Sequence, residues 1–175
     1  FAGISALEST CLIWGSTYLS ETIGLSADMA AALITFYFAG ITLGRFFSGL
    51  LSLKFSDWKI IILGQSAILI AVCILLLTDR TEPAVFGLFL IGLGNGPVFP
   101  NMTHLTPVLY KKETSQSIIG IEMAFSNLSI MLTPVLFGFV SGIWGTEIFP
   151  AFLAVMFVLM AGCTIVLKIG DSKSR

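Results

Sequence analysis

Residues 84–108, AVFGLFLIGLGNGPVFPNMTHLTPV, contain no Asp, Glu, Lys or Arg. A helix needs about 20 mostly apolar residues to cross the hydrocarbon core of a bilayer, so this stretch is long enough to span it. Residues 91–100 within it hold three glycines and two prolines. Irregular backbone at membrane depth is tolerated where protein buries it or where it lines a cavity. The run therefore predicts an interrupted, cavity-lining helix, with a simple kink around neighbouring helices as the alternative.

Composition extends the membrane assignment to the whole chain of 175 residues. Hydrophobic residues make up 56% and charged residues only 11%, against about 25% charged residues in soluble domains. The net charge of −1 offers no basic surface for nucleic acid, so no such partner is expected. The three cysteines lie in separate apolar stretches and indicate neither disulfides nor a metal site. No enzyme motif occurs, and we expect no catalytic activity and no cofactor.

Six apolar stretches predict one domain, residues 1–175, of six membrane-spanning helices: 1–19, 29–53, 60–77, 84–108, 117–143 and 148–167. The connections between them are short, so consecutive helices should be antiparallel neighbours. The sequence begins at Phe1 without a Met, and we expect it to be a fragment of a longer protein.

Basic residues gather at one side of the predicted bundle, where the second, fourth and sixth spans end: Lys54, Lys59, Lys111, Lys112, Lys168, Lys173 and Arg175. The opposite side carries Arg80 among several acidic residues. Because cytoplasmic loops are enriched in Lys and Arg, both termini are predicted to be cytoplasmic.

Two glutamates lie inside apolar stretches, Glu8 in the first span and Glu122 in the fifth. A carboxylate at that depth costs about 2.5 kcal/mol or more, so each marks a candidate functional site. Each could carry a proton or could be a structural carboxylate tied to a neighbouring polar group. Glu122 begins a polar stripe at helical spacing, which must face protein or water: Glu122, Ser126, Ser129 and Thr133, with Asn127 beside it.

Other polar and small residues predict helix packing. A small-residue stripe in the second span, Gly40, Gly44, Ser48 and Ser52, predicts a close helix contact. We expect this stripe to be exposed in the six-helix unit, which should therefore be unstable alone. Gln65 is expected to donate a hydrogen bond between helices, and His104 to be a hydrogen-bonded residue near the cytoplasmic end. Arg45 is expected to pair with an acid or to act in gating.

Several segments resemble the carboxy-terminal half of major facilitator superfamily transporters. Residues 1–8, FAGISALE, followed by WGSTYL at 14–19, resemble the seventh helix of that family, and residues 38–49, FAGITLGRFFSG, resemble the eighth. Residues 94–100 resemble the tenth helix, and EMAF at 122–125 with LTPVLFG at 132–138 resemble the eleventh. The branch most similar is the fucose and glucose/galactose permease-like group.

The family's loop signature, Gly-x-x-x-Asp-Arg-x-Gly-Arg-Arg, is present as a decayed copy. Gly49 keeps its first glycine and Lys54 a base at the Arg position, whereas Leu53 replaces the Asp and Ser56 the second glycine. The resemblance implies that Arg45, Gly49, Lys54 and Asp57 belong to this gating or cytoplasmic-loop region.

The resemblance implies an all-α membrane protein whose six transmembrane helices form one half of a major facilitator fold, built from two inverted three-helix repeats. Its first and fourth spans would line a central cavity. The substrate-side candidates are then Glu8, Trp14, Asn95 and Phe99. From the polar stripe of the fifth span, Glu122, Ser126 and Asn127 are further candidates for substrate binding or coupling. The second and fifth spans would face an amino-terminal six-helix half, the expected partner along with the lipid bilayer.

The resemblance also implies secondary active transport of a small polar solute, in particular proton-coupled sugar uptake by alternating access in a bacterial plasma membrane. Two alternatives stay open. One is a drug or metabolite exporter of the same superfamily. The other is a stand-alone six-helix membrane protein acting as a homodimer or scaffold.

Overall fold

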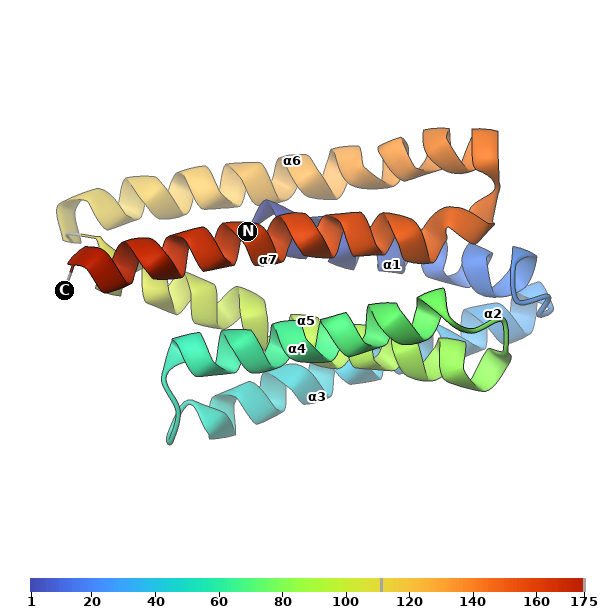
Figure 1. The fold of residues 1–175 in the computed structure, drawn as a ribbon, viewed down its shortest axis with the longest axis horizontal. Coiled ribbons are helices and arrows are strands. Elements are labelled where there is room, and N and C mark those ends of the chain that lie inside the picture. The colour runs from blue at the N-terminus through green and yellow to red at the C-terminus, as the bar shows by residue number, and fades with distance from the viewer. Residues whose placement is uncertain (111, 175) are drawn as a thin grey trace.

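The computed structural model describes residues 1–110 and 112–174, and these residues form a long bundle of helices (Figure 1). In chain order the elements are α1 (Ala2–Glu21), α2 (Ala27–Leu33), α3 (Thr35–Leu51), α4 (Asp57–Leu76), α5 (Thr81–Leu109), α6 (Lys112–Trp144), the 3-10 turn η1 (Thr146–Ile148) and α7 (Phe149–Ser174). The segments α2 and α3 together make one span, Ala27–Leu51. The all-helical, six-span architecture predicted from the sequence is confirmed. Lys111 and Arg175, which contributed to the predicted orientation, lie outside the described residues.

Among the described residues, five segments are long and apolar enough to cross a membrane, and α1 is not among them. Its sequence carries Glu8 and several hydroxyl residues. Helices α2, α5, α6 and α7 pack against it, so Ile4, Leu7 and Cys11 are completely buried, whereas Leu12 and Ile13 are exposed. A helix enclosed by protein can carry more polar groups than one facing lipid, because its neighbours supply the hydrogen-bond partners.

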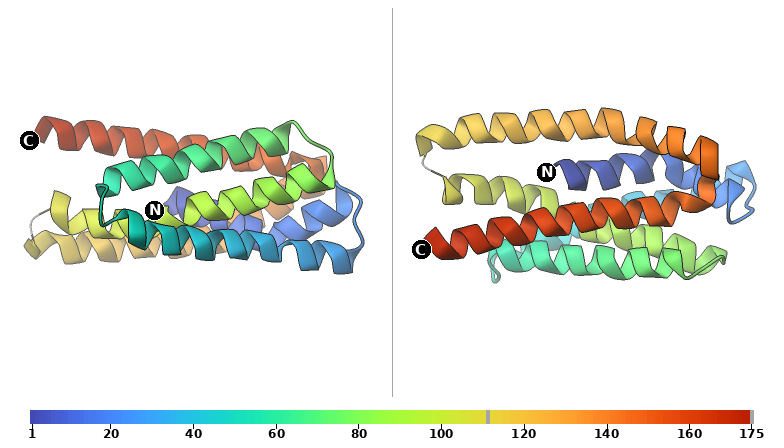
Figure 2. Two further views of the ribbon diagram at one scale, coloured as in Figure 1. Left: turned by 90° about the horizontal axis from the view of Figure 1, so that it is seen from below. Right: turned by 45° about the horizontal axis from the view of Figure 1, so that its top comes forward.

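Helices in each half of the chain pack against the first helix of the other half. Both α3 and α4 pack mainly against α5, whereas both α6 and α7 pack against α1. In each three-span unit, the second and third spans thus cover the first span of the other unit (Figure 2). This reciprocal pairing is the arrangement expected of two three-helix repeats related by a pseudo-twofold axis.

Glycine allows α5 to lie directly against the backbone of two neighbours. A Cβ added at Gly44 of α3 would collide with the Leu93 carbonyl oxygen, and one at Gly92 of α5 with the Tyr37 carbonyl oxygen. On the other side, a Cβ at Gly64 of α4 would lie 2.5 Å from the Gly94 carbonyl oxygen. The small-residue stripe of the second span is therefore a packing face, as predicted.

The stripe is not the exposed surface on which the expected instability rested. Gly40, Gly44 and Ser48 are buried against α5, and only Ser52, just after the end of α3, is exposed. That reason for expecting instability does not hold, because the contact lies within this chain.

The expected interruption of the fourth span does not occur. Helix α5 runs without a break from Thr81 to Leu109, with Pro97, Pro100 and Pro107 inside it. Pro97 cannot donate to the carbonyl of Leu93, four residues earlier. That carbonyl instead lies against Gly44 of α3. Close helix packing, rather than unwinding, accommodates the glycines and prolines.

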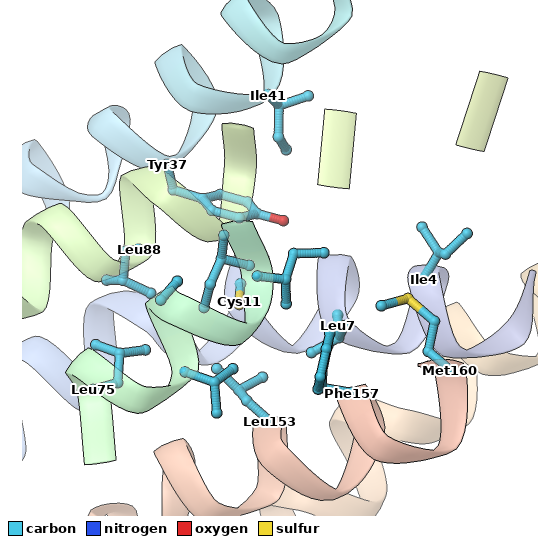
Figure 3. Packing of buried hydrophobic residues seen from close by; sticks show 14 of the residues in the cluster. Ile4, Leu7, Cys11, Tyr37, Ile41, Leu75, Leu88, Leu153, Phe157 and Met160 are labelled. Atoms are coloured by element: carbon cyan, nitrogen blue, oxygen red, sulfur yellow. The ribbon is translucent and has the colours of Figure 1, made fainter. Parts of the chain in front are cut away.

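A core of buried side chains joins the two units at the centre of the bundle (Figure 3). Residues of α1 meet residues of α7 there, next to side chains from the α3–α4–α5 group. The labelled members are Ile4, Leu7, Cys11, Tyr37, Ile41, Leu75, Leu88, Leu153, Phe157 and Met160. This packing fixes α1 beside α5, where the polar groups of the two helices meet.

Candidate functional site

Three helices meet at Glu8. The Asn95 Nδ2 of α5 donates a hydrogen bond to Glu8 Oε2 at 3.2 Å, and Arg45 Nη2 of α3 lies 3.8 Å from Glu8 Oε1. The Tyr37 hydroxyl donates to the backbone carbonyl of Glu8 at 3.4 Å. The structure thus unites Glu8, Arg45 and Asn95, which the sequence singled out separately. We call these three residues the Glu8 cluster.

Glycine also explains how Arg45 reaches this cluster. A Cβ added at Gly96 would lie 3.0 Å from the backbone nitrogen of Arg45. The backbone of Arg45 therefore passes beside the residue that follows Asn95. A larger residue at Gly96 would separate α3 from α5 and move the guanidinium away from Glu8.

Asn95 has an unusual hydrogen-bonding state. Its side chain is 1% exposed, its Nδ2 is bound to Glu8, and its Oδ1 has no hydrogen-bond partner among the described residues. An unsatisfied buried acceptor costs about 1–3 kcal/mol. Such groups are uncommon in folded proteins and often have a functional explanation. The Asn95 amide is therefore a candidate functional group of the bundle interior.

A cavity of about 880 Å³ opens beyond Arg45, towards the end predicted to be cytoplasmic. The end of α3, the start of α4 and the second half of α5 line it: Arg45, Ser48, Gly49, Ser52, Phe55, Ser56, Asp57, Phe99, Pro100, Asn101 and His104. Of the gating candidates, Arg45, Gly49 and Asp57 are lining residues, whereas Lys54 is exposed in the α3–α4 connection. Phe99 also packs edge-on against the Phe1 ring, with centroids 5.4 Å apart.

His104 and Asp57 form a pair at the mouth of this cavity. The His104 Nδ1 lies 3.0 Å from Asp57 Oδ2, which joins α5 to the start of α4. The expectation that His104 is hydrogen bonded is therefore confirmed. Deeper in the cavity wall, Asn101 Nδ2 donates to Ser48 Oγ and to the Pro97 carbonyl, each at 2.6 Å.

Glu122 lies apart from the Glu8 cluster. The Thr106 hydroxyl lies 3.0 Å from each of its carboxylate oxygens, next to a small cavity of about 60 Å³. One turn further along α6, Ser126 Oγ contacts Ser5 Oγ of α1 at 2.5 Å. The polar stripe therefore faces protein, as predicted, whereas Asn127 is exposed beside it.

Trp14 belongs to the contact between α1 and α6. Its Nε1 donates to the Pro134 carbonyl at 3.0 Å, and its ring packs edge-on against Phe137 with centroids 5.2 Å apart. The structure therefore places it away from the Glu8 cluster, against α6.

Two polar groups of the site were missed by sequence reasoning. Tyr37, fully buried beside Glu8, carries its hydroxyl in an otherwise apolar part of the second span. Asn101, 5% exposed, was not among the candidate site residues. A polar side chain within an apolar span is the one sequence signal that would have selected both.

Comparisons with known proteins agree with this architecture. The Major Facilitator Superfamily profile matches residues 2–174. A solved structure, described as the in meso crystal structure of the POT family transporter PepTSo, superposes with a TM-score of 0.82 at 14% sequence identity. The alignment covers 98% of this chain but 35% of that transporter, so the present chain spans about a third of its length.

At this identity the structural likeness concerns the fold. No curated protein matches the chain. The sequence profile, however, covers nearly every residue, and the reciprocal helix pairing fits the same fold. The chain belongs to the Major Facilitator Superfamily.

Proposed function

We propose that this chain is the carboxy-terminal half of a secondary active transporter, of the fucose and glucose/galactose permease-like branch, that takes up a small hydroxylated solute together with protons. The observation that carries the proposal is the Glu8 cluster, in which one carboxylate links α1 to both α3 and α5. Ionisable groups inside membrane spans are expensive and mark ion or substrate pathways.

The cluster provides a protonation-dependent link between helices. Ionised Glu8 attracts Arg45 of α3 and accepts a hydrogen bond from Asn95 of α5. Protonation of Glu8 removes the attraction to Arg45. A carboxamide offers both a donor and an acceptor, so Asn95 can remain bonded to the neutral acid. Proton binding would then loosen α1 from α3 while preserving its contact with α5.

The hydroxyl and amide groups around the adjacent cavity suit a polar solute. Ser48, Ser52, Ser56 and Asn101 line it close to Arg45. In this proposal the solute reaches the cavity when the two halves of the intact protein rock apart on the cytoplasmic side.

The test is uptake by the intact transporter in proteoliposomes with an imposed proton gradient and a panel of radiolabelled sugars and sugar acids. We expect Glu8→Gln to lower proton-driven accumulation by roughly tenfold or more, the loss corresponding to about 1.4 kcal/mol or more of coupling. Exchange of internal for external solute, which needs no net proton movement, should persist. Glu21→Gln is the matched control, because Glu21 is exposed at the end of the same helix.

Accumulation and pH dependence equal to wild type in Glu8→Gln would assign Glu8 a structural role. If cells carrying the intact protein resist toxic compounds but take up no sugar, the protein is an exporter instead.

A further inference from the structure

Arg45 is the starting point for a more specific statement about the solute. Its side chain is 57% exposed and lines the 880 Å³ cavity. Its distance to Glu8 is 3.8 Å, well beyond the roughly 2.7–2.9 Å of a charge-assisted hydrogen bond. The guanidinium is therefore held loosely by this acid, and most of its five donors are available to another acceptor.

Glu8 does not depend on Arg45 alone. Asn95 donates to its carboxylate, and the Tyr37 hydroxyl holds its backbone carbonyl. When Arg45 turns towards the cavity, Glu8 keeps a hydrogen-bond partner. This arrangement lowers the cost of releasing the guanidinium.

The other ionisable side chains that line the cavity, Asp57 and His104, contact each other. Asp57 and His104 lie 3.0 Å apart at its mouth. The rest of the polar wall is formed by Ser48, Ser52, Ser56 and Asn101. The Ser48 hydroxyl accepts from Asn101 and the Ser52 hydroxyl donates to the Gly49 carbonyl, so both oxygens keep acceptor capacity. Within the described lining, a loosely held guanidinium therefore faces a wall rich in hydroxyl groups.

We propose that Arg45 binds the carboxylate of the transported solute and that the solute is a hydroxylated organic acid, such as a sugar acid, rather than a neutral sugar. The guanidinium fork matches a carboxylate with two parallel hydrogen bonds, which a neutral hydroxyl cannot accept. The serine hydroxyls bind the solute's own hydroxyls. Glu8 and the solute compete for Arg45, so solute binding and the Glu8–Arg45 ion pair exclude each other. This inference rests on the proposed transport function and specifies its substrate class.

The experiment is equilibrium binding of radiolabelled D-gluconate and D-glucose to the purified intact protein in nanodiscs. We expect gluconate to bind about tenfold or more tightly than glucose, the advantage of one charge-assisted contact. Arg45→Gln should abolish this difference. Glu8→Gln should tighten gluconate binding several-fold, because it removes the competing carboxylate. Lys59→Gln is the matched control for lost positive charge, since exposed Lys59 does not line the cavity, and should bind gluconate as wild type does.

Two results would overturn the inference: glucose bound as tightly as gluconate by wild type, or unchanged gluconate affinity in Glu8→Gln. Glu8→Gln keeps Arg45 in place, so the inference can be tested even if Arg45→Gln fails to fold. Both results are independent of the proposed transport function. If that function is correct and only the substrate class is wrong, proton-driven uptake of a neutral sugar would persist.

Discussion

At the scale of residues, single hydrogen bonds between buried side chains join neighbouring helices of the bundle. Gln65 Nε2 donates to Thr164 Oγ1 at 2.7 Å and joins α4 to α7, which confirms the interhelical role predicted for Gln65. Both side chains are buried, so neither group can turn to water when the other is lost.

We expect Thr164→Val to destabilise the intact protein by about 1 kcal/mol, since such bonds in membrane proteins contribute about 0.6 kcal/mol on average and up to about 1.7 kcal/mol. The valine is similar in shape but leaves the Gln65 amide without its acceptor. Thr164→Ser keeps the hydroxyl and should remain close to wild type. Thermal unfolding in detergent measures both variants, and equal stability of the valine and serine variants would refute this role.

Sequence reasoning identified Glu8, Asn95 and Arg45 individually, because a charged or amide side chain is conspicuous in an apolar span. It could not predict that they meet. Their contact depends on the close packing of α3 against α5 at Gly96 and on the orientation of α1 about its own axis. Neither can be inferred from the spacing of residues within one helix. For the same reason Trp14 was grouped with the cavity, although its indole nitrogen is bound to Pro134 on α6.

At the scale of elements, α5 is held between two neighbours by contacts that leave no room for side chains. A Cβ at Gly64 would lie 2.5 Å from the Gly94 carbonyl oxygen, whereas one at Gly162 of α7 would have no atom within 4 Å. Gly64→Ala should therefore force α4 and α5 apart.

We expect Gly64→Ala to cost about 1–3 kcal/mol of stability, the usual penalty for overpacking. Gly162→Ala should be neutral or stabilise by up to about 1 kcal/mol, since alanine favours the helix and meets no obstacle. Thermal unfolding of the two variants of the intact protein compares them directly. A Gly64→Ala protein as stable as Gly162→Ala would show that the contact between α4 and α5 is looser than described.

The prolines and glycines of residues 91–100 predicted an interrupted, cavity-lining helix. The interruption does not occur, whereas Phe99 and Pro100 of this run do line the cavity. The same residues serve either purpose, since a missing side chain permits both an irregular backbone and a close helix contact. The outcome depends on whether another helix carries glycine at the matching height, as α3 does at Gly44. That information lies on a different span, outside any local pattern.

At the scale of the whole molecule, the connections alternate between the two ends of the bundle (Figure 1). Lys54 follows α3 at one end, and Asp79 precedes α5 at the other. The positive-inside rule assigns the first end to the cytoplasm.

Membrane-impermeant maleimide applied to intact cells should label Asp79→Cys and leave Lys54→Cys unlabelled until the cells are opened. The background should lack native cysteines, because Cys73 and Cys163 are exposed on the bundle surface. The reverse labelling pattern would invert the orientation.

The enclosed position of α1 also bears on how the chain is made. Helix α1 is less apolar than the other long helices, and two of its main packing partners, α6 and α7, come at the far end of the sequence. From Glu21 to Lys112 there are 112 − 21 = 91 residues to synthesise, a delay of roughly 5–20 seconds at about 5–20 residues per second. During that interval, only helices synthesised before α6 can shield the carboxylate and hydroxyl groups of α1. Its final docking is thus a late event of biogenesis, although it is the first of these helices to leave the ribosome.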